Sequence, residues 1–268
     1  MKIGPIELSQ QRTTIMGVLN VTPDSFSDGG QHNTAQAAIA KAEEMIANGA
    51  GIIDVGGEST RPGAKPVSEA EELQRVVPVI EAISKLGIAI SVDTSTPEVM
   101  RQAVSAGAHL INDVRALSRP GALEMAASLN VPVCLMHMQG EPQTMQQAPS
   151  YDDVVVQVKQ YLYQQVQRCR EAGIADNQIM LDPGFGFGKT LDHNIALFKA
   201  LPELTQAFPV LVGVSRKRMI GELTGRDVAQ RIAGSVGAAL KAAQYGAHIV
   251  RVHDVQETND ALQVWYSL

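Results

Sequence analysis

The sequence has 268 residues, of which 45% are hydrophobic and 19% are charged, and its formal net charge is −6. This composition is typical of a globular protein with a sizeable core. The acidic balance argues against a surface that binds nucleic acid. No apolar stretch approaches the roughly 20 residues that a membrane-spanning helix needs, so we expect no membrane partner.

The first ten residues, MKIGPIELSQ, lack the apolar core and the small-residue cleavage site of a secretion signal. The two cysteines, Cys134 and Cys169, lie far apart in the sequence. Their spacing favours neither a disulfide framework nor a metal site. We therefore expect a cytoplasmic protein.

Short apolar runs rich in Val, Ile and Leu alternate along the chain with segments whose apolar residues recur at helical spacing. The runs show little alternation of apolar and polar residues, which is typical of parallel strands buried on both faces. The predicted strands are 14–20, 51–55, 88–93, 109–114, 131–138, 178–182, 209–215 and 248–254. The predicted helices are 35–47, 69–85, 97–106, 122–129, 152–172, 194–201, 228–245 and 256–265.

This alternation predicts parallel strands covered by helices, and its eight units indicate a closed (β/α)8 TIM barrel. No linker or low-complexity stretch interrupts it, so residues 1–268 form a single predicted domain. The alternative is a doubly wound open sheet, but the GxGxxG fingerprint that such a sheet carries after its first strand is missing. Several predicted helices are followed by short segments such as NGAG and YGAH, in which a glycine is placed to end the helix before the next strand.

Every predicted strand ends at or near a side chain that can take part in chemistry. In a barrel the C-terminal ends of all strands share one face, where active sites form. Any one of these residues could be a helix N-cap or a turn residue, but their recurrence at all strands, with His and Arg included, favours a site. They are Asn20, Asp54, Asp93, Asn112, His137, Asp182, Ser215, and the pair Arg251 and His253.

The segment DPGFGFGKT, 182–190, resembles a phosphate-binding loop, but GxxxxGK[ST] needs a glycine where Pro183 stands. We interpret it as a loop that lets the backbone approach a flat ligand, with Asp182 at its base. A carboxylate there suits a ring edge with N–H and NH2 side by side, as in guanine or a pterin. The alternative is that Asp182 only forms a turn.

Other loops carry basic residues suited to an anion. Arg61 lies in the glycine- and proline-rich loop GGESTRPGAKP, and arginine grips phosphate in a bidentate manner, although a solvated surface arginine is the alternative. Arg251 and His253 are two apart on one strand and point to the same side. A buried, unpaired arginine is costly, so we expect both to face an anion at the barrel mouth. The histidines form no HExxH motif, which disfavours zinc.

Eight motifs in chain order resemble those of the dihydropteroate synthases, the folate-pathway enzymes that sulfonamides target. They are NVTPDSFSDGG, GGESTRPG, SVDTS, INDV, LMHMQG, DPGFGFGK, GVSRKR and RVHDV. The resemblance implies a (β/α)8 barrel that joins 6-hydroxymethyl-7,8-dihydropterin diphosphate to p-aminobenzoate and releases pyrophosphate. It also implies an SN1-like reaction with ordered loop closure, a Mg²⁺ cofactor and a homodimer.

The resemblance assigns roles to individual residues. For the pterin edge they are Asp93, Asn112, Asp182 and Lys217, and for the diphosphate they are Thr60, Arg61, Arg251 and His253. For p-aminobenzoate they are Phe26, Pro62, Phe187 and Ser215, with Asp28 completing that site. Asn20 would bind Mg²⁺, and the predicted catalytic residues are Asp28, Arg61, Lys217, Arg251 and His253.

Two other functions stay open at this point. One is a pterin-binding barrel of the methyltetrahydrofolate:corrinoid methyltransferase type, which would share the pterin-edge residues but has no use for a diphosphate pocket. The other is a non-catalytic paralogue that binds pterin and regulates. Pyrophosphate release from a pterin diphosphate distinguishes both from a synthase.

Overall fold

The computed structural model describes residues 1–21, 31–59, 63, 67–140, 145 and 148–268, and within them eight parallel strands form a barrel. The strands are β3 (Thr14–Asn20), β4 (Ile52–Gly56), β5 (Ala89–Asp93), β6 (Leu110–Asp113), β7 (Val133–Met136), β8 (Ile179–Asp182), β9 (Leu211–Val212) and β10 (Ile249–Val252). From β3 to β8 each strand pairs with the next one in the chain, β9 pairs with β10, and β10 pairs with β3. A single bridge between Leu181 of β8 and Val210, the residue before β9, closes the barrel. The predicted (β/α)8 barrel is confirmed, and the open sheet is excluded.

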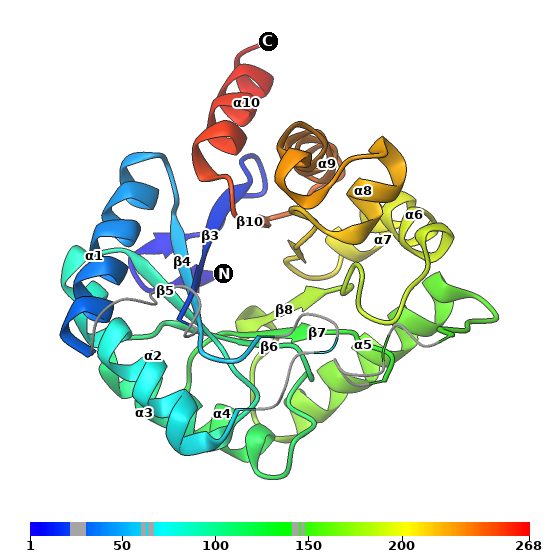
Figure 1. Ribbon diagram of the computed structural model, residues 1–268. Helices are drawn as coiled ribbons and strands as arrows, with labels where there is room; N and C mark the ends of the chain where they lie inside the picture. The colour runs from blue at the N-terminus through cyan, green and yellow to red at the C-terminus, as the bar shows by residue number, and fades with distance from the viewer. Residues whose placement is uncertain (22–30, 60–62, 64–66, 141–144, 146–147) are drawn as a thin grey trace.

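Helices surround the barrel on the outside (Figure 1). They are α1 (Gln31–Ala47), α2 (Glu69–Ile83), α3 (Pro97–Ala106), α4 (Ala122–Leu129), α5 (Val154–Glu171), α6 (Leu191–Lys199), α7 (Leu201–Thr205), α8 (Arg218–Thr224), α9 (Ile232–Gln244) and α10 (Val255–Ser267). Among the described residues no helix is both long enough and apolar enough to cross a membrane.

Local sequence explains where several helices begin and end. Ser68 caps α2 by accepting the Glu71 N–H, and Thr190 caps α6 by accepting the His193 N–H, so α6 begins three residues earlier than its apolar spacing predicts. The glycines of NGAG and YGAH, Gly49 and Gly246, adopt φ values of 100° and 85° and end their helices as predicted.

Two predicted helices differ from the structure. The helix expected at 194–201 is divided into α6 and α7, because Pro202 stands in the first turn of α7, where proline begins a helix. The helix expected at 228–245 starts with a 3-10 turn, Val228–Gln230, ahead of α9. The short helix α8 was not predicted.

The floor of the barrel is a layer of apolar side chains, one from each strand, covered by the N-terminal hairpin of β1 (Lys2–Ile3) and β2 (Ile6–Glu7). This floor layer consists of Met16, Ile52, Ala89, Leu110, Cys134, Met180, Leu211 and Ile249. Ile3 and Leu8 pack against it, and Ile3 is fully buried. The hairpin was not predicted, because strands of two residues have no periodicity to detect. The opposite end of the barrel is therefore where a ligand can enter.

Candidate active site

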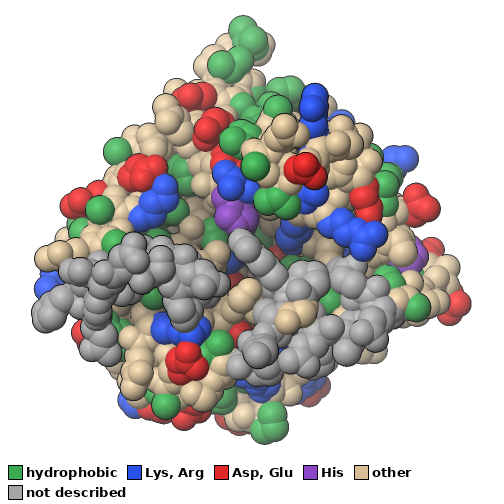
Figure 2. Space-filling view, in the orientation of Figure 1, with side chains coloured by type: hydrophobic (Ala, Val, Ile, Leu, Met, Phe, Trp, Pro, Cys, Tyr) green, Lys and Arg blue, Asp and Glu red, His purple; other side chains and the backbone are tan. Residues whose placement is uncertain are grey.

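Polar side chains replace the apolar floor layer one step further along the strands. Asp54, Asn112 and Asp182 lie two residues after floor residues of β4, β6 and β8, so they also point into the barrel. Asp93 ends β5 and is paired in register with Asn112. Basic and histidine side chains gather near the middle of the face shown in Figure 2. The prediction that chemical side chains of many strands meet at one face is confirmed for the described residues.

Arg251 on β10 is bound by two carboxylates of the protein itself. Its Nε lies 2.6 Å from Asp54 Oδ2, and its Nη2 lies 3.0 Å from Asp93 Oδ2. Asp54 is fully buried, and only 22% of the Arg251 side chain is exposed. The premise that a buried Arg251 would be unpaired is therefore wrong, because the protein supplies its counterions, while its role at the diphosphate stays a prediction.

Asp54 also lies beside Asn112, whose Nδ2 is 3.5 Å from both of its carboxylate oxygens. Burial raises the pKa of Asp93 above its usual range, and the Asp54 carboxylate raises it further, against the lowering effect of Arg251. One buried polar cluster thus spans four strands, and it consists of Asp54, Asp93, Asn112 and Arg251. Of these, the sequence assigned no role to Asp54, although a lone carboxylate inside the apolar run GIIDV was a signal.

Asp182 and Lys217 form the second half of the mouth. Asp182 Oδ1 accepts the Gly184 N–H at 2.7 Å, and burial raises the pKa of this carboxyl, against the lowering effect of Lys217. Lys217 Nζ donates to Phe185 O at 2.5 Å and lies 4.6 Å from the centre of the Phe187 ring. Burial lowers the pKa of Lys217 to about 8. The structure thus brings Phe187 next to the predicted pterin-edge lysine.

Gly213, just after β9, lies between these cations. A Cβ at this position would lie 3.8 Å from Lys217 Nζ and 3.9 Å from Arg251 Cβ, which are ordinary contact distances. Lys217, the N-cap residue of α8, and Arg251 on β10 therefore come close to each other beside Gly213. The mouth therefore combines two cations, Lys217 and Arg251, with three buried carboxylates, Asp54, Asp93 and Asp182.

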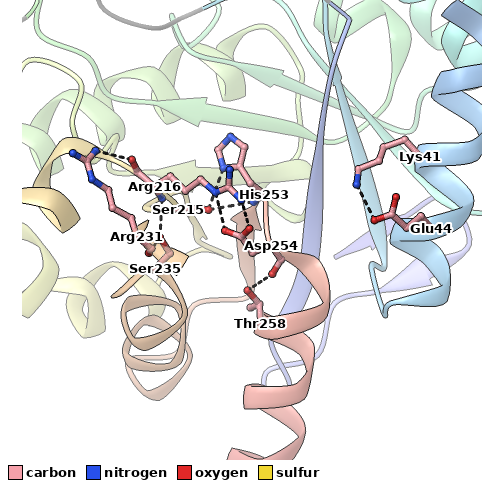
Figure 3. A network of polar contacts seen from close by, with 9 residues as sticks. All are labelled: Lys41, Glu44, Ser215, Arg216, Arg231, Ser235, His253, Asp254 and Thr258. Carbon is pink, nitrogen blue, oxygen red and sulfur yellow. Dashed lines mark hydrogen bonds and ion pairs between the residues drawn. The ribbon is translucent and has the colours of Figure 1, made fainter. Parts of the chain in front are cut away.

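Ser215 and His253 lie together above the ends of β9 and β10 (Figure 3). Ser215 Oγ lies 3.1 Å from His253 Nδ1 and accepts the His253 N–H at 3.2 Å. The structure therefore places Ser215 beside His253, a residue of the predicted diphosphate pocket. Phe187, which was predicted to share the p-aminobenzoate site with Ser215, contacts Lys217.

Arg216 holds the turn between Ser215 and Lys217 in place. Its φ of 57° lies in the left-handed region, which a residue with a Cβ rarely adopts. Its guanidinium forms a two-point ion pair with Asp254, one bond of which measures 3.0 Å, while its N–H donates to Ser235 Oγ at 2.8 Å and its carbonyl accepts from Arg231 at 3.1 Å (Figure 3). No pattern in the sequence predicts this support, because its partners Arg231, Ser235 and Asp254 come from later segments of the chain.

Asn20 ends β3 close to Asp93. Both side chains border Gly56, because a Cβ on this glycine would lie 3.4 Å from Asp93 Cβ and 3.8 Å from Asn20 Oδ1. Within the described residues no cluster of three His, Cys, Asp or Glu side chains could hold a metal. Mg²⁺ takes oxygen ligands and keeps several waters beside substrate phosphates, so a single amide oxygen is compatible with it. The remaining predicted site residues lie outside the described residues: Phe26, Asp28, Thr60, Arg61 and Pro62.

Comparison with known proteins agrees with this geometry. Residues 16–253 match the model of the pterin binding enzyme family. A dihydropteroate synthase of Escherichia coli is 58% identical over 252 residues, which cover 93% of this chain and 89% of the relative. A dihydropteroate synthase of Haemophilus influenzae is 53% identical, with 94% and 92% covered.

Solved structures are also similar over nearly the whole chain. The structure of Yersinia pestis dihydropteroate synthase with a sulfonamide drug complex has a TM-score of 0.94 and 51% identity, and the match covers 100% of this chain and 98% of that one. The Xanthomonas albilineans enzyme in complex with 7,8-dihydropteroate has a TM-score of 0.87 and 50% identity, with 97% and 95% covered. Both the barrel and its length are shared with these proteins.

Proposed function

Because the chain belongs to the dihydropteroate synthase family, it is a transferase that joins 6-hydroxymethyl-7,8-dihydropterin diphosphate to p-aminobenzoate, and we propose that the reaction takes place in the barrel mouth described above. The observation that carries this proposal is the convergence of Asp93, Asn112, Asp182 and Lys217 on one interior surface. A methyltransferase-like barrel and a non-catalytic paralogue are not favoured.

We propose that the pterin ring lies between the two halves of the mouth. One oxygen of Asp182 already accepts the Gly184 N–H, but each carboxylate oxygen can accept a further hydrogen bond, so both together can accept the N–H and NH2 edge of the ring. Asn112 and Asp93 face the ring from β6 and β5. In its ionised form the Asp182 carboxylate favours positive charge on the ring, which supports an SN1-like course in which the bond to the diphosphate breaks first.

The leaving diphosphate needs cations close to its oxygens. Arg251 and His253 come from one strand, and Arg251 can exchange a carboxylate partner for phosphate because both are bidentate acceptors. Thr60 and Arg61 complete the proposed pocket. Asn20 would hold Mg²⁺ there, and the ion, when bound, would share the negative charge of the diphosphate. The weakly basic aromatic amine then attacks the pterin methylene carbon, so no protein nucleophile is required.

For p-aminobenzoate we propose a site bordered by Phe187, Lys217 and Ser215, with Phe26, Asp28 and Pro62 as its remaining residues. We propose that it is completed after the diphosphate binds, because fixing loop backbone costs about 1–2 kcal/mol per residue and a small aromatic acid makes few contacts. Calorimetry with the pterin pocket filled should show p-aminobenzoate binding only after Mg²⁺ and pyrophosphate are added. Equal affinity without them would mean that the site is preformed.

The proposed function is tested by turnover of the purified protein. We expect pyrophosphate release that requires both pterin diphosphate and p-aminobenzoate and that is lost when Mg²⁺ is chelated. Pterin binding without turnover would point to the non-catalytic paralogue. Methyl transfer from methyltetrahydrofolate to a corrinoid, in place of pyrophosphate release, would point to the methyltransferase.

We also propose a homodimer, as the resemblance implies. Two of the large apolar side chains that the structure leaves exposed, Val156 and Tyr163, lie on α5, and the others lie on the last segments of the chain: Leu223, Val228, Val264, Trp265 and Leu268. Burying such side chains between two copies would stabilise a dimer. Sedimentation of the purified protein measures this, and a monomer at micromolar concentration would contradict it.

A further inference from the structure

A buried lysine beside the proposed site has no role in the reaction described so far. Lys189 ends the loop between β8 and α6, and only 3% of it is exposed. Its Nζ donates to Gly184 O at 2.9 Å and to Phe187 O at 3.1 Å, and it lies 2.9 Å from His137 Nδ1. Burial lowers the pKa of His137 to about 3, and Lys189 adds to this effect. His137 is therefore neutral and accepts from the lysine.

Lys189 fixes a loop that is pressed against the end of β7. Gly184 and Gly188 have φ values of 68° and 63°, and a Cβ on them would lie 1.9 Å from His137 O and 2.4 Å from Gln139 O. The hydroxyl of Tyr151 donates to Gly188 O at 2.8 Å. Hydrogen bonds thus hold the loop against β7, while the fully buried ring of Phe185 anchors it in the core, 5.2 Å from the centre of the Phe198 ring.

The same loop is bound on its other side by Lys217. Lys217 Nζ donates to Phe185 O at 2.5 Å, and the Phe187 ring stands 4.6 Å from that nitrogen. The two lysines therefore bind neighbouring carbonyls of one short loop, Lys189 those of Gly184 and Phe187, and Lys217 that of Phe185. The places of the Phe187 ring and of the Lys217 ammonium depend on the backbone that Lys189 holds.

We propose that Lys189 is a positioning residue for p-aminobenzoate, acting by fixing the loop 184–188 so that Phe187 and Lys217 form the wall of that site. This inference rests on the proposed function, which places p-aminobenzoate beside Phe187. The physical reason is the entropy of the loop. A segment with three glycines in five residues populates many backbone conformations when nothing holds it, and only one of them forms the wall. A ligand that needs this conformation loses affinity in proportion to its population.

The test replaces Lys189 by methionine, which keeps the length of the stem but donates no hydrogen bond. We expect the KM for p-aminobenzoate and the inhibition constant of a sulfonamide to rise about tenfold or more, if the competent loop population falls to about one tenth. Affinity for the bare pterin, measured by calorimetry, should fall less than the affinity for p-aminobenzoate. Asp93 and Asn112 lie on strands outside the loop and keep their places, whereas Asp182 and Lys217, which also face the pterin, are bonded to the loop.

Thr190→Ala is the matched control. Thr190 follows Lys189 in the chain and caps α6, because its Oγ accepts the His193 N–H at 3.2 Å. The substitution removes this cap and weakens the start of α6, but it leaves the hydrogen bonds of Lys189 Nζ in place. A general loss of structure in this segment would affect both variants alike and would lower the active fraction rather than one KM. We expect Thr190→Ala to lower the melting temperature while its KM for p-aminobenzoate stays at the parent value.

A double-mutant cycle with Phe187→Ala tests whether Lys189 acts through the loop. If it does, adding Lys189→Met to Phe187→Ala raises the KM for p-aminobenzoate much less than it does in the parent. Fully additive effects, or an unchanged KM in Lys189→Met, would overturn the proposal. A wild-type protein that does not turn over would instead refute the proposed function, so the two failures are distinguishable.

Lys189→Gln, which keeps an N–H donor in the cavity, provides a second variant if the methionine variant does not fold. It should give a rise in the same KM. If neither variant folds, Lys189 serves the fold and not the site, and the proposal fails.

Discussion

The floor and the mouth of this barrel are built by the same strands and differ by a single step of the pleat. Met180 and Asp182 stand two residues apart on β8, as do Ile249 and Arg251 on β10. Two residues of strand span about 6.6 Å. Within that distance the interior changes from a purely apolar layer to one that holds carboxylates and cations.

The two layers contribute to the protein in opposite ways. The floor stabilises the fold by burying apolar surface. The mouth contains charges whose burial is costly. Within the described residues it also contains Ser91 Oγ, a buried hydroxyl without a hydrogen-bond partner. A polar surface that is already in place can bind a polar ligand without reorganising, which is how active sites use such a cost.

The largest effect should come from breaking the ion pairs of the mouth. Arg251→Met leaves Asp54 and Asp93 buried without their cation, and losing one partner of a buried ion pair costs about 3–5 kcal/mol of the free energy of unfolding. Urea unfolding at pH 7 measures this. Because burial raises the pKa of Asp93 to about 8, this carboxyl is charged above that pH and takes up a proton below it, so the loss should be larger at pH 9 than at pH 7. An equal loss at both pH values would contradict the ion-pair account.

The matching change in the floor should reduce stability without touching binding. Met180 is fully buried, and Met180→Ala should lower the free energy of unfolding by about 2–5 kcal/mol through the lost contacts and the cavity left behind. Calorimetry should show parent-like affinity for the pterin in the folded fraction. A variant with weakened pterin binding would show that the floor and the mouth are coupled.

Asp182→Asn changes the residue two positions after Met180 on the same strand. It should weaken pterin binding and leave stability nearly unchanged. Asparagine keeps an oxygen for the Gly184 N–H but offers NH2 to a ring donor, which leaves a buried polar pair unmatched. We expect pterin affinity to fall by about 1–3 kcal/mol or more, with little change in the melting temperature. If the variant binds pterin as tightly as the parent, the ring edge lies elsewhere.

The smallest effect is a pH dependence of activity set by Lys217. Burial lowers its pKa from 10.5 to about 8, so the ammonium that faces Asp182 is present below that pH and is lost above it. We expect kcat/KM to fall as the pH rises through about 8. Over the interval from about 8 to 10.5 the unfolded chain holds the extra proton, so the contribution of Lys217 to stability rises with pH. A fall in activity that follows unfolding would contradict this assignment.

The sequence by itself determined the barrel and most of the residues around its mouth. Runs of Val, Ile and Leu buried on both faces, alternating with amphipathic segments, require parallel strands inside a ring of helices. A chemical side chain at the end of each run then places Asn20, Asp93, Asn112 and Asp182 on one face, because parallel strands all end there. These signals are local in the chain and can be detected without knowing which strands touch.

Only the tertiary structure decided what each charge is bound to. Arg251 lies 197 positions from Asp54 and 158 from Asp93, so no spacing rule could reveal that the protein supplies its counterions. Lys189 likewise holds its loop only because the fold places His137, the residue after β7, within hydrogen-bond distance of its Nζ. A hydrogen bond or an ion pair forms wherever the fold brings two groups within about 3 Å, and that distance depends on the packing of the whole barrel rather than on the local sequence.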